Sequence, residues 1–305
     1  MATTNTEIYR KFQGQLRRAP LRFLPLAAAS IRTATKRKFP LLVLYAPLLI
    51  ATVIFSFVVY VRFSLAAGRT PDAFGGSANP AMAMMTGVAE TVLQVKRQIV
   101  LFHLATTTFA FLIVAWFGAG LIAEDKRLGA HLLYFARPLT RLDYLLAKFT
   151  TLAFFGAFAV IVPPLVICTV ATFASPDWAF LEDEGDLIPK TILFGLVWIL
   201  VCASVILAIS SLSSRKSFAL VATFAVFVLP VPVSGVLSRL EHEPRFQTLS
   251  LPGNFVKLAQ SLFGFPSGGR SMRYDVEYAY GALAVITLVA WIVLVVRVRR
   301  LEAVA

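Results

Sequence analysis

The chain has 305 residues, of which 58% are hydrophobic and 15% are charged, and its mean hydropathy is +0.77. A soluble globular domain is closer to half apolar and a quarter charged, so this composition excludes an ordinary soluble protein. The net charge of +13 is not accompanied by an aromatic-basic platform or a recognition-helix pattern, and we expect no nucleic acid to bind. The apolar residues fall into runs of about twenty, the length that crosses a bilayer. The sequence therefore predicts an integral membrane protein.

The N-terminal segment, residues 1–38, is strongly basic, and its one acid is Glu7. Apolar side chains recur in it at helical spacing between Arg and Lys residues: Tyr9, Phe12, Leu16 and Phe23. A basic amphipathic helix of this kind is suited to the headgroup region of a membrane, although a solvated basic tail is the alternative. Pro20 and Pro25 interrupt the pattern, so we expect a separate short helix in residues 26–38.

Six apolar runs follow, and none contains Lys, Arg, Asp or Glu. Each must form a helix, because an open strand edge in lipid would leave backbone groups unpaired. The expected spans are residues 39–61, 99–123, 149–174, 191–212, 218–237 and 278–296. Prolines within them predict kinks or breaks: Pro47, Pro163, Pro164, Pro230 and Pro232. The predicted fold class is an all-α membrane protein with a six-helix transmembrane domain over residues 39–296.

Most of the 29 Lys and Arg residues lie on one side of this arrangement when the N-terminus is placed inside. The loop at 175–190, on the other side, is acidic. The positive-inside rule therefore predicts that both ends are cytoplasmic, including the tail 297–305, in a multi-pass protein of the cell's inner (cytoplasmic) membrane. Four basic residues are expected to anchor helices at the inner membrane interface: Lys148, Arg215, Lys216 and Arg297.

The chemistry that the chain lacks is as informative as its spans. Ion-coupled carriers need ionisable side chains at membrane depth, and only His103 lies within a predicted span, where a packed histidine is the simpler interpretation. Residues 264–270 read GFPSGGR, which does not match a phosphate-binding Walker A loop. Cys168 and Cys202 lack metal-ligand spacing. We therefore expect no cofactor or metal bound by this chain, and neither an intramembrane enzyme nor an ion-coupled carrier.

The loop between the second and third spans carries the clearest local pattern. Residues 125–136 are predicted to form a short helix, with Leu128, Leu132 and Phe135 on one face. Glu124 and Asp125 suit the helix N-terminus, and the dipeptide Arg137-Pro138 ends the helix. Thr140 and Asp143 match a capping box for the next helix, which enters the membrane near Lys148. From the residues alone, this short helix could fit a groove on a partner or pack against its own bundle.

This loop resembles the permease subunits of type-2 ATP-binding-cassette (ABC) transporters. That family has an acid, a glycine, an Arg-Pro pair, a second arginine and a lysine that enters the third span, and the matching positions here are Asp125, Gly129, Arg137, Pro138, Arg141 and Lys148. The chain departs from the family at Ala130, where many members have Thr, and at Ala147, where the usual residue is Gly. The six-span layout with both ends inside and the basic N-terminal segment are also similar.

The resemblance implies a mechanism in which the energy comes from a partner. Two copies of the permease would pair, and two separate ATPase subunits, which bind ATP and Mg, would dock on the cytoplasmic face. The helix between spans two and three would be the coupling helix, with these residues in the contact: Asp125, Gly129, Leu132, Phe135, Arg137, Pro138 and Arg141. The expected function is ATP-driven export of an unidentified substrate. The alternative is a membrane scaffold that anchors a cytoplasmic partner without transporting anything.

Overall fold

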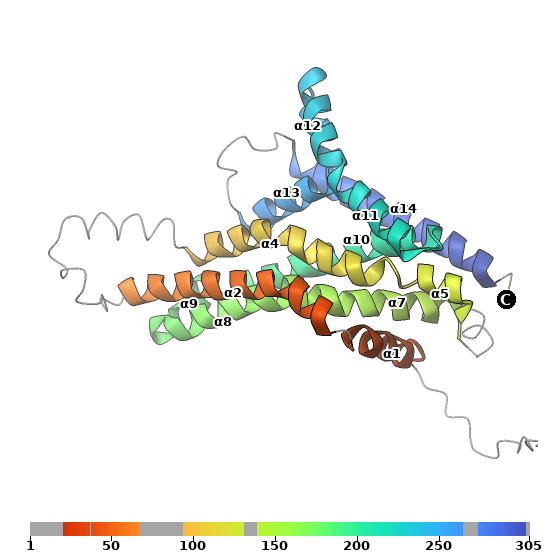
Figure 1. Cartoon of the computed structure of the whole chain (residues 1–305). Coiled ribbons are helices and arrows are strands. Elements are labelled where there is room, and N and C mark those ends of the chain that lie inside the picture. The colour runs from red at the N-terminus through yellow and green to blue at the C-terminus, as the bar shows by residue number, and fades with distance from the viewer. Residues whose placement is uncertain (1–20, 37, 67–93, 131–138, 265–273, 303–305) are drawn as a thin grey trace, which may run out of the picture.

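The computed structural model describes residues 21–36, 38–66, 94–130, 139–264 and 274–302. Within these residues every regular element is a helix, and the long helices run side by side in one elongated bundle (Figure 1). Six helical runs are long and apolar enough to cross a membrane: Pro40–Ser64, Val95–Leu128, Arg141–Ala174, Leu187–Leu212, Lys216–Leu240 and Val276–Arg299. These runs cover the six predicted spans to within one residue and extend several of them, so the predicted fold class is confirmed at the level of six apolar helices.

The first two helices are joined near one end of the bundle. Helix α1 (Phe23–Thr35) packs against α7 (Arg141–Gly156). Helix α2 (Lys38–Ala66) packs against α8 (Val162–Ala174) and α4 (Val95–Gly118). The short helix expected in residues 26–38 is therefore present, and it begins slightly earlier. Pro25 does not interrupt it, because it lies in the first turn, where backbone N–H groups have no partner within a helix. The rest of the predicted amphipathic segment, residues 1–20, lies outside the described residues.

The second apolar run is divided into two helices. Helix α4 (Val95–Gly118) ends inside the predicted span, and after a short turn the chain forms α5 (Ala123–Leu128). Gly118 marks the end of α4, and a Cβ atom there would lie 2.5 Å from Ile206 Cγ2. The close approach of α4 to α10 therefore requires a residue without a side chain at this position.

The third span contains a widened turn before its two prolines. Helix α7 (Arg141–Gly156) continues into a π-helical segment, η2 (Ala157–Ile161), and then into α8 (Val162–Ala174). Pro163 and Pro164 have no N–H group for the preceding turn, and their rings would clash with it in a regular α-helix. The π segment, a common form of single-turn bulge, accommodates them without ending the helix. The kink or break predicted at these prolines is therefore a local widening of the helical turn, and the helix continues through it.

Helix α10 (Leu187–Leu212) is the centre of the bundle. It contacts α14 (Val276–Glu302), α7 and α4, and 67% of its most apolar stretch is buried. The corresponding stretch of α2 is only 17% buried, so α2 presents a largely apolar surface to its surroundings. Such a surface is suited to lipid, because hydrocarbon tails are as apolar as the side chains.

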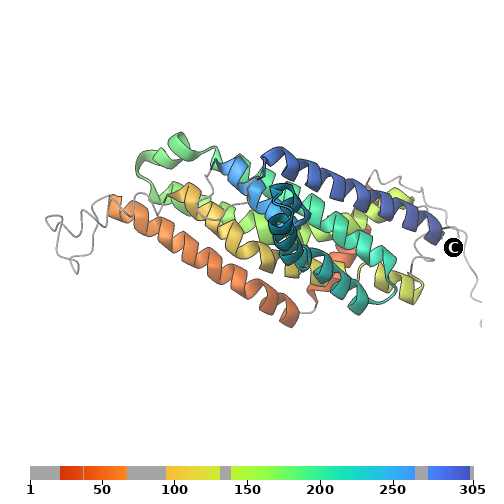
Figure 2. The same cartoon turned by 90° about the horizontal axis from the view of Figure 1, so that it is seen from above.

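The fifth apolar run bends away from the others. Helix α11 (Lys216–Val228) lies along the bundle, whereas α12 (Pro230–Leu240) projects from it, as Figures 1 and 2 show. The bend coincides with the predicted prolines. The 3₁₀ helix η4 (Pro244–Leu249) then leads back to α13 (Leu251–Phe263).

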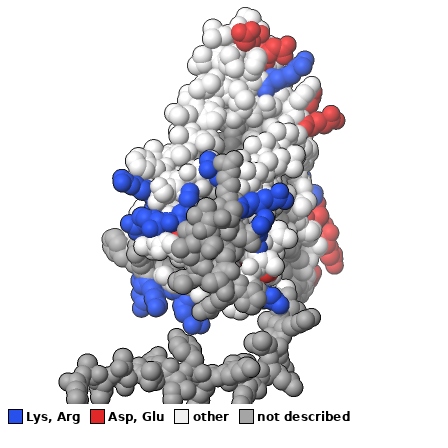
Figure 3. All heavy atoms as spheres, turned by 90° about the vertical axis from the view of Figure 1, so that its right-hand side faces the viewer, with Lys and Arg blue, Asp and Glu red and all other residues white. Residues whose placement is uncertain are grey.

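The two ends of the bundle carry different short helices. We call the end with α1 and α5 the α5 end, and the opposite end the α13 end, where η3 (Pro176–Trp178), α9 (Ala179–Glu184) and α13 lie. Figure 3 views the α5 end and shows Lys and Arg side chains around it.

Candidate functional site at the α5 end

Helix α5 is short because a glycine ends it. Gly129 has φ 69° and ψ 10°, a left-handed conformation, and its N–H group bonds back to the carbonyls of Asp125 and Lys126. Only glycine adopts this conformation without steric cost, which gives a physical reason for the glycine in the sequence pattern. The helix predicted over residues 125–136 is therefore interrupted at Gly129, because α5 covers Ala123–Leu128, and residues 131–136 lie outside the described residues.

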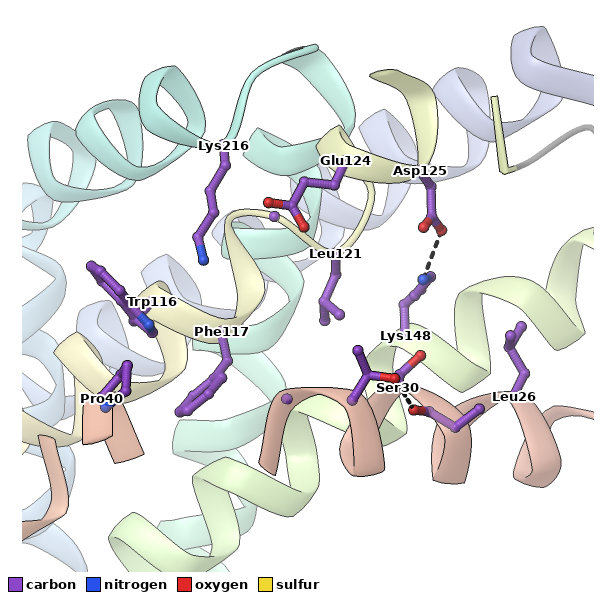
Figure 4. A pocket seen from close by; sticks show the side chains of 14 residues that line it. Leu26, Ser30, Pro40, Trp116, Phe117, Leu121, Glu124, Asp125, Lys148 and Lys216 are labelled. Carbon is purple, nitrogen blue, oxygen red and sulfur yellow. Dashed lines mark hydrogen bonds and ion pairs between the residues drawn. The ribbon is translucent and has the colours of Figure 1, made fainter. Parts of the chain in front are cut away.

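A buried ion pair fixes α5 to the third span. The Asp125 Oδ2 atom lies 2.7 Å from Lys148 Nζ, and the two side chains are 15% and 3% exposed (Figure 4). The Tyr144 hydroxyl, one turn earlier on α7, donates to the same oxygen at 2.9 Å. Lys148 therefore does not extend to lipid headgroups as predicted, because it is buried against its partner. Charge-assisted bonds in such a dry site are short, strong and directional.

The start of α7 is set by the predicted capping box. Thr140 Oγ1 accepts a hydrogen bond from the Asp143 N–H group at 3.1 Å, and Asp143 Oδ2 accepts one from the Thr140 N–H group at 3.0 Å. This reciprocal pair satisfies two backbone donors that the helix itself cannot satisfy. Because the cap fixes the first turn of α7, it also fixes the height at which Tyr144 and Lys148 meet α5.

A serine of the fourth span holds the turn between α4 and α5. Ser210 Oγ accepts hydrogen bonds from the N–H groups of Ile122 and Ala123, both at 3.1 Å, and donates to the Ala119 carbonyl at 2.8 Å. Ser210 is fully buried. Its hydroxyl therefore supplies partners to three backbone groups that would otherwise be unpaired where one helix ends and the next begins.

Lys126 joins α5 to the end of α10 by a second route. Its Nζ donates to the carbonyl of Ser211 at 2.9 Å and to that of Ser213 at 3.0 Å. The last carbonyls of a helix lack intrahelical donors and carry partial negative charge, so a lysine there is favourable. Together these contacts make α5 a unit with α7 and α10, and we call the set Asp125, Lys126, Tyr144, Lys148 and Ser210 the α5 junction.

The other predicted site residues are coupling residues, membrane anchors and residues outside the described part of the chain. Of the predicted coupling residues, Leu128 is 71% exposed at the tip of α5, and Arg141 is exposed at the start of α7. Arg215 is exposed, and Lys216 and Arg297 are half-buried. The last group lies outside the described residues: Leu132, Phe135, Arg137 and Pro138.

The α13 end contains the one histidine predicted within a span. His103 is 2% exposed, and its ring lies 4.4 Å from that of Phe194 and 5.9 Å from that of Phe263, centroid to centroid. This aromatic surrounding fits the packed residue expected from the sequence. In the part of the chain that the structure describes, no group of three or more His, Cys, Asp or Glu residues is placed to hold a metal ion.

Sequence reasoning missed three members of the α5 junction. Lys126, Tyr144 and Ser210 were not singled out from the sequence. The sequence did offer an indication for Ser210, because a serine in an otherwise apolar span usually forms a hydrogen bond with the backbone. No sequence signal indicated which backbone groups it would satisfy, because the turn at 119–122 was expected to be helical.

The six apolar helices define a multi-pass membrane protein, and polar bonds join its short helix α5 to the long spans. A search of curated proteins found no match to the chain. The family model described as ABC-2 family transporter protein matches residues 38–298, which is most of the chain. The protein therefore belongs to the ABC-2 transporter family and is a membrane component of a transporter. This result confirms the family resemblance drawn from the loop between the second and third spans.

Proposed function

We propose that this chain is the permease subunit of an ABC transporter and that α5 receives the force generated by a separate ATPase subunit. The observation that carries the proposal is the α5 junction. Helix α5 has a single buried residue, Ala123, yet polar bonds join it to α7 and to α10. A displacement of α5 is therefore passed to two spans rather than absorbed by a loose loop. Leu128, at the tip of α5, is 71% exposed and available to a docking partner.

The proposed orientation places the α5 end in the cytoplasm, with both chain termini on that side. The clustering of Lys and Arg around this end supports it (Figure 3). At the α13 end, α9 carries Glu182, Asp183 and Glu184, which is consistent with an outer surface. The corresponding location is the cytoplasmic membrane.

The proposed assembly has two copies of the permease and two ATPase subunits, and each ATPase binds ATP and Mg. The chain itself offers no nucleotide-binding sequence, so the energy for transport comes from the partner. The proposed direction is export, of a substrate that the charge-free spans do not identify. The exposed apolar faces of α2, α11 and α12 provide surface for lipid and for the second permease copy.

The test is reconstitution of the permease with the ATPase that co-purifies with it. We expect the complex to hydrolyse ATP and to use that hydrolysis for transport, and Asp125→Asn to uncouple the two, because the force path to α7 then lacks its ion pair. Asp186→Asn is the matched control, since Asp186 pairs with Lys190 at the exposed α13 end. If no ATPase binds the extracted protein, or if Asp125→Asn transports like the unmodified protein, the proposal fails.

The same experiment distinguishes a scaffold from a transporter. A scaffold would hold an ATPase or another partner through α5 without a dependence of hydrolysis on substrate. ATPase activity that rises with a candidate substrate, and that loses this response in Asp125→Asn, supports the permease. Binding of a partner with no such response supports the scaffold.

A further inference from the structure

A cavity of about 280 Å³ lies between α1 and the rest of the α5 end. Figure 4 shows it from close by, with α1 on one side and the end of α4 on the other. Its apolar wall is formed by Leu26, Pro40, Trp116, Phe117 and Leu121. Charged side chains form the rest of its wall, so the cavity is amphipathic rather than a simple packing defect.

A second hollow of about 280 Å³ adjoins the first and shares two of its residues, Glu124 and Lys216. Arg127 and Arg215 complete its charged lining. In Figure 4 the Lys216 amine and the Glu124 carboxylate are directed into the same space, beside Trp116. The Lys216 Nζ atom also lies 4.8 Å from the centre of the Trp116 ring. The space around Lys216 and Glu124 therefore has an apolar side, formed by Trp116, and a basic side, formed by Arg127 and Arg215.

The charges of the two hollows do not cancel. Asp125 and Lys148 line the first hollow but neutralise each other at 2.7 Å. The remaining acid is Glu124, and it faces Lys216 together with the two arginines of the second hollow. The joined space has a net positive charge at the end of the molecule where its basic residues gather.

We infer that this joined space binds an anionic glycerophospholipid. The headgroup phosphate would lie among Lys216, Arg127 and Arg215, and the upper part of an acyl chain would lie along Trp116 and Phe117. Basic pockets between transmembrane helices at a membrane surface are suited to anionic headgroups. An amphipathic ligand is favoured over a soluble anion, because the apolar wall would gain nothing from a soluble anion. The inference concerns this chain alone and does not require the proposed ATPase.

The bound lipid would connect α1 to the α5 junction. Ser30 and Thr33 of α1 line the first hollow opposite Glu124 and Asp125. A lipid in this position contacts both α1 and α5, so it would set their separation and favour one position of α5. The proposed role is therefore structural support for the helix that receives force, supplied by the surrounding membrane.

The test is native mass spectrometry of the full chain released from micelles that contain equal amounts of phosphatidylglycerol and phosphatidylcholine. We expect retention of phosphatidylglycerol in preference to phosphatidylcholine. Lys216→Gln should weaken that retention by about fivefold, the contribution of one basic residue near a membrane surface. Lys190→Gln, which removes a lysine from the α13 end, is the control and should leave retention unchanged.

A second variant separates the shape of the site from its charge. Gly120 lines the first hollow, and a Cβ atom there would lie 3.1 Å from Lys216 Cδ and 3.2 Å from Glu124 Cδ. Gly120→Leu should therefore fill the space and prevent lipid retention with every charge still present. The melting temperature without added lipid shows whether each variant is folded.

Four results would overturn the inference. One is equal retention of the two lipids, and another is an equal loss in Lys216→Gln and Lys190→Gln. The third is displacement of phosphatidylglycerol by millimolar glycerol 3-phosphate, which would assign the site to a soluble anion instead. The last is a co-purified ATPase that occupies the site in place of lipid. This result would assign the basic side of the site to a protein contact and would contradict the inference.

Discussion

The two ends of the bundle hold short helices by opposite means. At the α13 end, α13 buries most of its apolar side chains, including Phe255, Leu258 and Phe263, and polar caps complete it. At the α5 end, α5 buries only Ala123 and is held by an ion pair, a serine hydroxyl and a lysine. Apolar burial is non-directional and grows with area, whereas these polar bonds depend on geometry. The α13 end is therefore built as a packed cover, and the α5 end as a polar junction, which suits its proposed role in transmitting displacement.

The hydrogen bonds at the α13 end support this distinction. Asn254 Nδ2 donates to the Thr248 carbonyl at 2.7 Å, and the Tyr274 hydroxyl donates to Asn254 Oδ1 at 2.9 Å. These bonds join α13 to the segments on either side of it, and an exposed contact of 3.3 Å between the Ser261 and Tyr280 hydroxyls joins it to the single span α14. The bonds of the α5 junction join three separate spans. We therefore expect substitutions at the α13 end to lower stability alone, and substitutions at the α5 end to lower both stability and the coupling of transport to ATP hydrolysis.

The largest effect is expected from removing one member of the ion pair. Lys148→Met leaves the largely buried Asp125 carboxylate without its cation, which should lower the free energy of unfolding by about 4 kcal/mol. Adding Asp125→Asn should recover part of this loss, because the uncompensated charge is then gone while an acceptor for Tyr144 remains. Denaturation in mild detergent measures both. An equal loss in the exposed Asp186→Asn control would contradict the assignment of this pair as buried.

A somewhat smaller effect is expected at the packed end. Phe263→Ala removes a fully buried ring that lies beside His103, and it should lower the free energy of unfolding by about 3 kcal/mol. Transport per ATP hydrolysed by the folded fraction should be unchanged, because α13 is not in the force path. Leu249→Ala, at an exposed position of the same end, should change stability by less than about 0.5 kcal/mol. Uncoupling in Phe263→Ala would remove the distinction between the two ends.

Ser210→Ala tests the serine that holds the α4–α5 turn. The change leaves the N–H groups of Ile122 and Ala123 without their acceptor and should cost about 2 kcal/mol of stability. Ser204→Ala is the matched control, because its hydroxyl donates to a carbonyl of its own helix, that of Leu200. Coupling should also fall in Ser210→Ala and not in Ser204→Ala. Equal behaviour of the two variants would show that the turn does not depend on Ser210.

The smallest effect is a pH dependence at the α13 end. Burial raises the pKa of the Glu184 carboxyl, and the charges of Arg62 and Lys96 offset part of that rise. Because the folded state then holds the proton more tightly than the unfolded state, stability falls as pH rises from the ordinary glutamate range through the raised pKa. Glu184→Gln should flatten this part of the stability profile, and Glu182→Gln, at an exposed position of the same helix, should not. A profile unchanged by Glu184→Gln would contradict the burial of a charged group there.

The sequence predicted the parts of the fold that depend on local pattern. The six apolar runs and the capping box of Thr140 and Asp143 follow from hydropathy and short-range spacing, and both are present. The extent of α5 and the role of Lys148 were predicted wrongly. The end of α5 follows from Gly129, a local C-cap signal that the prediction did not use, whereas the role of Lys148 depends on a contact between segments distant in sequence. A basic residue near a span end has the same local pattern whether it reaches the headgroups or pairs inside the bundle. The family pattern placed Asp125 and Lys148 in one motif without indicating that they touch.

The central claim is that a partner ATPase acts on the tip of α5. Its most direct test is cross-linking from Leu128→Cys to a co-reconstituted ATPase, with Leu249→Cys at the α13 end as the control. Both positions are exposed, and the native Cys168 and Cys202 are buried. The account predicts cross-links from position 128 whose yield changes with ATP, and none from position 249. Cross-links from position 249, or their absence at position 128 in a complex that hydrolyses ATP, would contradict it.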